Sequence, residues 1–295
     1  MTLPVAAVAV TVLSWAAAFP LIRLVLADVD PIPLAAIRFA VAALFAVAWL
    51  AFKRPKRPTV RDALRFTACG AVGISLYNIL LNTGQQTVSA GAASFIVNTL
   101  PIITALLSFL VLRERLTAWA WAGMAFSFCG IGLIAQGQPG GLDFGAGSTL
   151  VLAAACCSAV YFVIQRPLVP VYGALNCAAY TLLAGALLLA PWAPAGMAQA
   201  SGAPGATGLA VLALGVFPAA LGYATWTYAL GHYGAARAAN FLYLVPPVAT
   251  ALAVPLVGEW PTLQTLAGGA LAIAGVVVVN TRGRDPAPAK RVQVR

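Results

Sequence analysis

Charged residues are scarce in this chain. Only 8% of its 295 residues are Asp, Glu, Lys or Arg, whereas 62% are hydrophobic. A soluble domain carries about 25% charged residues, and a fold of this size could not cover its core with so few. A disordered chain would not tolerate so much apolar surface either. Soluble enzymes and disordered proteins are therefore excluded, and the composition indicates an integral membrane protein.

Groups that bind metals or relay protons are also few. The chain has one histidine and seven acidic residues, and its five cysteines lack CxxC spacing. His232 falls in a predicted loop, where one imidazole alone does not make a metal site. No acidic residue falls in the middle of a predicted span, where proton relays usually place one. We therefore expect free thiols, no metal, no cofactor and no proton relay.

The apolar residues form ten segments long enough to cross a bilayer, whose core of about 30 Å needs about 20 helical residues. No Lys or Arg precedes the first segment, so we expect it to be retained rather than cleaved as a signal peptide. The Gly/Pro-rich segment 191–208 is expected to be a loop. The predicted spans are residues 3–22, 32–52, 66–83, 90–112, 118–135, 147–165, 174–192, 208–230, 236–257 and 263–280.

The basic residues indicate how these spans are oriented. Lys and Arg exceed Asp and Glu by ten (17 − 7). If the N-terminus is inside, fifteen of the seventeen basic residues lie in the loops after spans 2, 4, 6 and 8 or in the tail. Cytoplasmic loops carry such an excess. We therefore expect a membrane protein with both termini cytoplasmic, whose positive charge meets anionic lipid and needs no nucleic-acid partner.

An internal repeat divides the chain near residue 140. Four residues recur at a spacing of 145, and they are Pro101 with Pro246, Glu114 with Glu259, Gly123 with Gly268, and Gly130 with Gly275. The predicted units are residues 1–140 and 141–282, with five spans each, followed by a basic tail, 283–295. Because five is odd, the two copies must lie in opposite orientations, as in secondary transporters. The predicted fold is an all-α membrane protein with ten transmembrane helices, arranged as two inverted five-helix repeats around a central cavity.

These features resemble a known family. Ser14-Trp15 in the first span, Pro31 and Arg38 in the second, and the two copies of Glu followed by Gly-x6-Gly are similar to the drug/metabolite transporter superfamily, in its EamA-type ten-helix branch. The resemblance covers nearly the whole chain. Within the branch, the chain is most similar to the bacterial YddG-type amino-acid exporters. The resemblance implies a small-molecule exporter of the bacterial inner (plasma) membrane.

Polar side chains recur along the third span at steps of three and four residues, which places them on one helix face. This stripe comprises Ser75, Asn78, Asn82 and Gln85, and Ser94 and Asn98 continue the pattern in the fourth span. The 145-residue offset maps Asn78, Asn82 and Asn98 onto Tyr223, Thr227 and Tyr243. The stripes are interpreted as walls of a cavity, although hydrogen bonds between packed helices are the alternative. The predicted substrate-binding residues are Trp15, Asn78, Asn82, Asn98, Tyr161, Tyr223, Asn240 and Tyr243.

Arg38 and two prolines are predicted to have special roles inside spans. Arg38 could act as a gate or bind a substrate carboxylate, or it could pair with Asp28, Asp30 or helix-end carbonyls near the outer surface. The second interpretation is slightly favoured. Pro101 and Pro246 occupy equivalent positions, where proline removes a backbone hydrogen bond and kinks a helix. We therefore expect them to be hinges.

The sequence thus predicts a secondary transporter that exports amino acids, aromatic and other neutral ones, by alternating access. The alternative is an exporter of other metabolites or drugs, with or without proton antiport. A membrane enzyme would need clustered catalytic groups, and a channel is usually built from several identical subunits. The expected partners are a small-molecule substrate and the lipid bilayer, and the protein is expected to be a monomer or a homodimer.

Overall fold

The computed structural model describes residues 3–100, 102–103, 117–137, 145–165, 167–233 and 241–282. All regular secondary structure in these ranges is helical, and none of these residues forms a strand. The all-α prediction is confirmed. The predicted hinge Pro101 and the predicted binding residue Asn240 lie outside the described residues.

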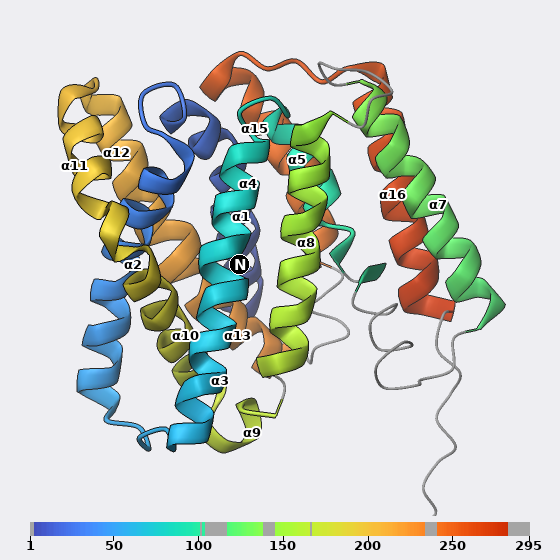
Figure 1. The fold of residues 1–295 in the computed structure, drawn as a ribbon. Coiled ribbons are helices and arrows are strands. Elements are labelled where there is room, and N and C mark those ends of the chain that lie inside the picture. The colour runs from blue at the N-terminus through green and yellow to red at the C-terminus, as the bar shows by residue number, and fades with distance from the viewer. Residues whose placement is uncertain are drawn as a thin grey trace, which may run out of the picture.

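The first half of the chain begins with two long helices, and its third span contains a π-helical turn (Figure 1). Its elements are α1 (Leu3–Val25), α2 (Pro31–Lys53), α3 (Val60–Gly70), the π-helical turn (Ala71–Leu76), α4 (Tyr77–Gly84), α5 (Ala90–Val97) and α7 (Ala118–Gln136).

The second half repeats this pattern, including a π-helical segment in its third span. Its elements are α8 (Ala146–Gln165), α9 (Val169–Tyr172), α10 (Ala174–Leu189), a 3-10 turn (Ala190–Trp192), α11 (Ala193–Gly202), α12 (Gly205–Leu214), the π-helical segment (Gly215–Leu221), α13 (Gly222–Tyr233), a second 3-10 turn (Leu242–Leu244), α15 (Val245–Val257) and α16 (Leu263–Arg282).

Two helix boundaries differ from the sequence prediction. The third span starts at Val60 rather than residue 66, because the Thr59 hydroxyl caps the helix by accepting a hydrogen bond from the Asp62 N–H (3.2 Å). The expected loop over residues 191–208 is also wrong, since most of it is helical. Proline is tolerated in the first turn of a helix, where its missing N–H is not needed, and the alanine-rich sequence after Pro194 favours continued helix.

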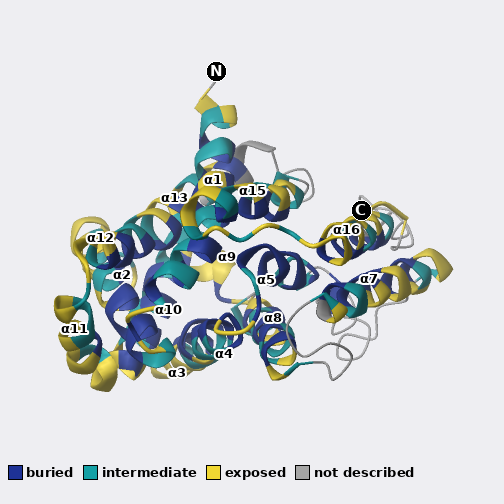
Figure 2. Ribbon diagram, turned by 90° about the horizontal axis from the view of Figure 1, so that it is seen from above, coloured by how far each residue is buried: buried dark blue, intermediate teal, exposed yellow. Residues whose placement is uncertain are grey.

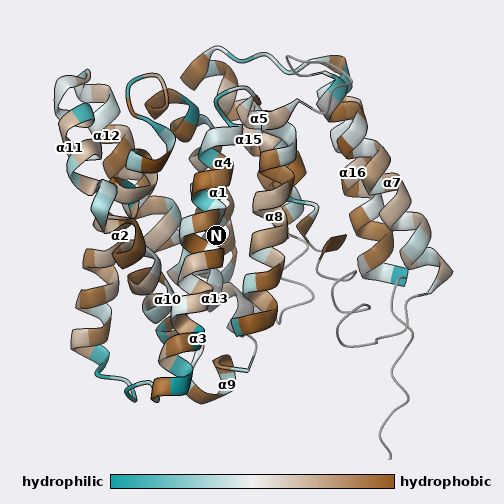
Figure 3. Ribbon diagram, in the orientation of Figure 1, coloured by the Kyte–Doolittle hydropathy of each residue, from teal (hydrophilic) through white to brown (hydrophobic). Residues whose placement is uncertain are grey.

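Six of the described helices are long and apolar enough to cross a membrane, and three shorter apolar helices accompany them. Large hydrophobic side chains such as Leu44, Phe52 and Leu187 are exposed on the outside of the bundle. Hydrophobic residues cover most of the helix length, and hydrophilic residues gather at the ends and connections (Figure 3). A surface of this kind is stable against lipid chains and unstable in water.

Helix α1 joins the two halves of the protein. It packs against α5 from the first half and against α12, α13 and α15 from the second. Ala16 and Ile22 on α1 are completely buried. From above, the buried residues of these helices face one another, and exposed residues lie on the periphery (Figure 2). Small and branched apolar side chains of α1 therefore hold the two halves together.

Helices α7 and α16 form a separate close pair beside the main bundle (Figures 1 and 2). A Cβ on Gly123 would lie 2.7 Å from the Gly275 carbonyl oxygen, and a Cβ on Gly130 would lie 2.6 Å from that of Gly268. Residue numbers therefore increase along α7 in the direction in which they decrease along α16, so the two helices are antiparallel. Between these contacts, the Ser127 hydroxyl donates to the Ala272 carbonyl (2.6 Å).

Candidate functional site

A cavity of about 230 Å³ lies between helices of the two halves. The first half contributes α1, α2, the π-helical turn, α4 and α5, and the second contributes α8, the π-helical segment, α13, the second 3-10 turn and α15. Sequence-predicted binding residues that line it are Trp15, Asn78, Asn98, Tyr161, Tyr223 and Tyr243.

Other residues of the predicted polar stripes lie outside the cavity wall. The Asn82 amide donates to the Pro31 carbonyl (2.9 Å), and the Gln85 amide donates to the Phe19 carbonyl (3.1 Å). Ser75 donates to the Gly185 carbonyl on α10 (3.1 Å). These three side chains therefore act as contacts between helices, the alternative that the sequence left open.

Trp15 is held in the cavity wall by partners from the second half. Its indole nitrogen donates to the Pro218 carbonyl (3.1 Å), and its ring meets Tyr223 edge-on at 5.8 Å and Trp226 at 5.4 Å. A Cβ on Gly222 would lie 2.6 Å from the indole nitrogen, so only glycine leaves room for the ring there. The Trp15 ring thus forms part of the wall, with its one polar atom bonded to the backbone of the second half.

The two π-helical stretches occupy equivalent positions in the two halves and both reach the cavity. Ala71–Leu76 contributes Gly73 and Ile74, and Gly215–Leu221 contributes Pro218 and Ala219. Wider π-helical turns often occur at functional sites. The sequence interpretation missed both of them. Pro218, inside a predicted span, was a signal for the second, because proline breaks the regular hydrogen-bond ladder.

Arg38 is a buried charge on α2 that lines the cavity. Its Nη1 donates to the Asn78 Oδ1 (3.2 Å), and its guanidinium lies over the Phe39 ring at 5.1 Å. The predicted pairing with Asp28 or Asp30 is wrong. Both aspartates lie about two turns away along the chain, and α12 and α11 supply their partners, Thr207 and Gln199.

The second predicted hinge also has a different setting. Pro246 lies in the first turn of α15, immediately after the 3-10 turn Leu242–Leu244. A proline in the first turn removes no interior hydrogen bond, because the N–H groups there have no partner within the helix. Pro246 thus stands where the 3-10 turn passes into α15, and its role as a hinge stays a prediction.

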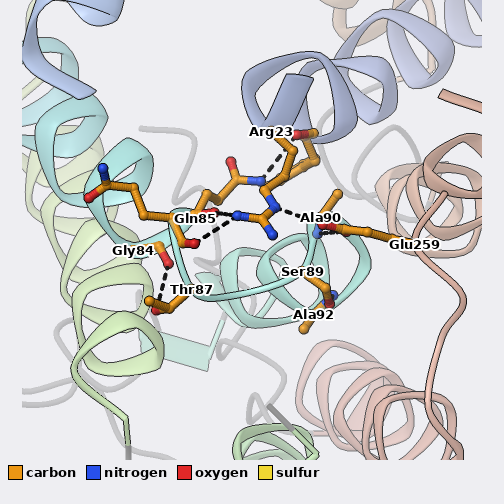
Figure 4. A network of polar contacts seen from close by, with 10 residues as sticks. Arg23, Gly84, Gln85, Thr87, Ser89, Ala90, Ala92 and Glu259 are labelled. Atoms are coloured by element: carbon orange, nitrogen blue, oxygen red, sulfur yellow. Dashed lines mark hydrogen bonds and ion pairs between the residues drawn. The ribbon is translucent and has the colours of Figure 1, made fainter. Parts of the chain in front are cut away.

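A polar network closes the bundle at the end where α1 and α15 finish (Figure 4). Arg23 Nε donates to Glu259 Oε1 (2.6 Å), and Arg23 Nη1 donates to the carbonyls of Gln85 (2.6 Å) and Gln86 (2.8 Å). Glu259 Oε2 accepts from the Ala90 N–H at the start of α5 (2.7 Å). Arg23 therefore joins α1 and the α4–α5 connection to the second half.

A larger cavity, of about 540 Å³, lies between α2, α10 and the second π-helical segment. Exposed apolar side chains such as Phe45 and Phe52 line it, and it shares Tyr161 and Tyr223 with the smaller cavity. It offers few groups that could orient a polar substrate. The smaller cavity, with its amides, phenols and Arg38, is therefore the better candidate site.

Comparison with known proteins identifies the family. The family model of the EamA-like transporter family matches residues 2–136 and, a second time, residues 145–281. The chain belongs to the EamA-like transporter family. This EamA-like protein is therefore a multi-pass membrane transporter and not an enzyme, and the same family unit occurs in each half of its sequence.

Several curated relatives match this EamA-like transporter over nearly its whole length. It is 37% identical to a probable terminal-alkyne amino-acid exporter of Streptantibioticus cattleyicolor, over 94% of this chain and 93% of the relative. It is 32% identical to the uncharacterized transporter YdfC of Bacillus subtilis, over 89% and 86%. It is 28% identical to the uncharacterized inner membrane transporter YedA of Escherichia coli K12, over 94% and 90%.

A solved crystal structure has a similar fold. It superposes with a TM-score of 0.60 over 92% of this chain and 96% of its own chain, at 23% identity. The likeness shows that both proteins share an architecture.

Proposed function

We propose that this EamA-like transporter exports neutral amino acids, aromatic ones included, across the bacterial inner membrane. The observation that supports this most is the chemistry of the central cavity. Its wall combines amides (Asn78 and Asn98) with aromatic rings (Trp15, Tyr161 and Tyr223). This mixture suits a zwitterion with an apolar or aromatic side chain. The name of the Streptantibioticus relative, a probable amino-acid exporter, agrees with this substrate class.

The size of the cavity favours a small metabolite over a bulky drug. Sites for drug-sized molecules measure about 300–1,000 Å³. The cavity bounded by the described residues measures about 230 Å³. An amino acid is therefore a better match than the larger substrates that other members of a transporter superfamily could carry.

The proposed architecture is ten transmembrane helices in two inverted halves, with both termini in the cytoplasm. The two matches to one family model support the duplication. The antiparallel α7–α16 contact supports the inversion, because these helices are equivalents in the two halves. Inverted halves with a site between them are the usual frame for alternating access.

In this orientation the Arg23–Glu259 network lies at the outer end of the cavity. We propose that it is the outer gate and that it opens when the substrate leaves. The transporter would work as a facilitator without proton coupling, since no acidic side chain is among the described residues that line the cavity.

Counterflow in proteoliposomes tests this function. Liposomes that contain the purified protein are loaded with one unlabelled amino acid at a time, and uptake of the same amino acid in labelled form is measured. We expect saturable counterflow of aromatic and other neutral amino acids, and at least a tenfold loss in Asn78→Ala and Tyr243→Ala. Matched controls are Asn176→Ala and Tyr228→Ala, because neither residue lines the cavity. If no amino acid of the panel is exchanged, or if the controls lose as much activity as the cavity variants, the proposal is wrong.

A further inference from the structure

Arg38 is a buried cation without an anionic partner in the described part of the chain. Only 8% of its surface is exposed, and it lies in the cavity wall. A guanidinium has five N–H donors. The neutral Asn78 oxygen accepts from Nη1, whereas the buried Nε has no hydrogen-bond partner among the described residues. Such a group is costly inside a membrane protein unless something compensates it.

Each acidic side chain that the structure describes is engaged elsewhere. Asp28 accepts from Thr207, and Asp30 accepts from Gln199. Asp62 pairs with Arg65 on its own helix, and Glu259 pairs with Arg23. None of these four carboxylates lines the cavity. Within the described part of the chain, no carboxylate is therefore paired with Arg38, which lies in the wall of the cavity.

The neighbours of Arg38 fix its orientation. The Asn78 amide donates to the Ile74 carbonyl (2.7 Å), and this bond turns the Asn78 oxygen toward Arg38. The guanidinium also lies over the Phe39 ring, 5.1 Å from its centroid. Asn78 is completely enclosed, with 1% of its surface exposed. The guanidinium is thus held in place before any ligand arrives, which lowers the entropy lost on binding.

We infer that Arg38 binds the carboxylate group of the transported substrate, and this inference rests on the proposed function. A guanidinium matches a carboxylate in shape and can donate two parallel hydrogen bonds to it. The described cavity wall holds no acidic group that could pair with a positive charge on the ligand. The substrate carboxylate is the feature that is recognised first, and its ammonium group meets neutral amides and phenols. Molecules that keep the amine and lose the carboxylate bind poorly.

A series of phenylalanine analogues tests the inference. Competition against labelled phenylalanine is measured with 3-phenylpropionate, which lacks the amine, and with phenylalaninamide and phenylethylamine, which lack the carboxylate. We expect phenylpropionate to compete in the native protein and the two amines to be weaker by about 10- to 100-fold, the range for a hydrogen bond to a charged group. Arg38→Gln is expected to remove this discrimination, and Arg38→Lys to restore part of it. Arg61→Gln, at an exposed arginine on α3 outside the cavity wall and outside the Arg23–Glu259 network, keeps it.

A binding measurement separates this inference from the proposed function. The melting temperature in detergent is recorded with and without 3-phenylpropionate, for the native protein and for Arg38→Gln. A stabilisation that needs Arg38 supports the inference even if no amino acid exchanges in liposomes, a result that would refute only the amino-acid function. An Arg38→Gln protein that melts normally and still prefers phenylalanine to phenylalaninamide overturns the inference. So does a native protein that phenylalaninamide inhibits as well as phenylpropionate does.

Discussion

Neutralising Glu259 is expected to open the end of the cavity that the Arg23–Glu259 network closes. The carboxylate accepts from Arg23 Nε at 2.6 Å and from the Ala90 N–H at 2.7 Å, and the two charged side chains are 30% and 18% exposed. Glutamine at position 259 can still accept the hydrogen bond from the Ala90 N–H, but it cannot form the ion pair with Arg23. Because the pair is partly buried, its loss costs the closed state about 1–2 kcal/mol. The ratio of open to closed molecules should therefore rise about 5- to 30-fold.

Thiol labelling measures this ratio. Ala18, which lines the cavity, is replaced by cysteine in a protein whose five native cysteines are removed. A charged, membrane-impermeant methanethiosulfonate reagent is applied from the side of the membrane on which the Arg23–Glu259 network lies, and the initial labelling rate is compared with and without Glu259→Gln. The rate should increase by the same factor as the open population. Asp62→Asn neutralises an acid outside the network and should leave the rate unchanged. An unchanged rate in a folded Glu259→Gln protein would refute the gate.

Two further predictions concern the helix pair and the energy source. Gly130→Ala would place its Cβ 2.6 Å from the Gly268 carbonyl, and such overpacking costs about 1–3 kcal/mol, so the melting temperature in detergent should fall. Gly132→Ala, on the same helix with open space around it, is the control and should not lower it, whereas equal melting of both variants would contradict the contact. A pH gradient imposed alone should drive no accumulation of phenylalanine in liposomes, and accumulation above equilibrium would show proton coupling.

The broad plan of the fold could be read from the sequence because hydrophobic length and the 145-residue repeat depend on local composition. The all-α membrane architecture followed from these features. The 191–208 segment was misjudged because its glycines and prolines suggested a loop, although proline fits a first helical turn. The π-helical turns escaped prediction because a wider turn depends on packing between helices, and a regular period of 3.6 residues assumes that it is absent.

The polar stripe of the third span shows that helical periodicity does not predict which residues of one helix face line the cavity. Asn78 and Asn82 are one turn apart, but only Asn78 lines the cavity. At the level of Asn82, α2 approaches closely enough for a hydrogen bond to the Pro31 carbonyl. A helix face can therefore be assigned from spacing, whereas the depth at which neighbouring helices separate depends on the packed structure. The partner of Arg38 was unpredictable for the same reason, since the fold places Asn78 beside it and occupies both nearby aspartates.

Joining both repeats in one polypeptide frees matching positions to differ. Ser127 and Ala272 stand 145 residues apart and touch each other, so in an assembly of two identical chains they would have to be the same amino acid. The same freedom applies where Asn78 corresponds to Tyr223 and Asn98 to Tyr243, all of which line the cavity. A nearly symmetric scaffold thereby encloses a chamber with chemically unlike sides. Such a chamber can bind the two ends of a substrate molecule in different ways and so fix its orientation.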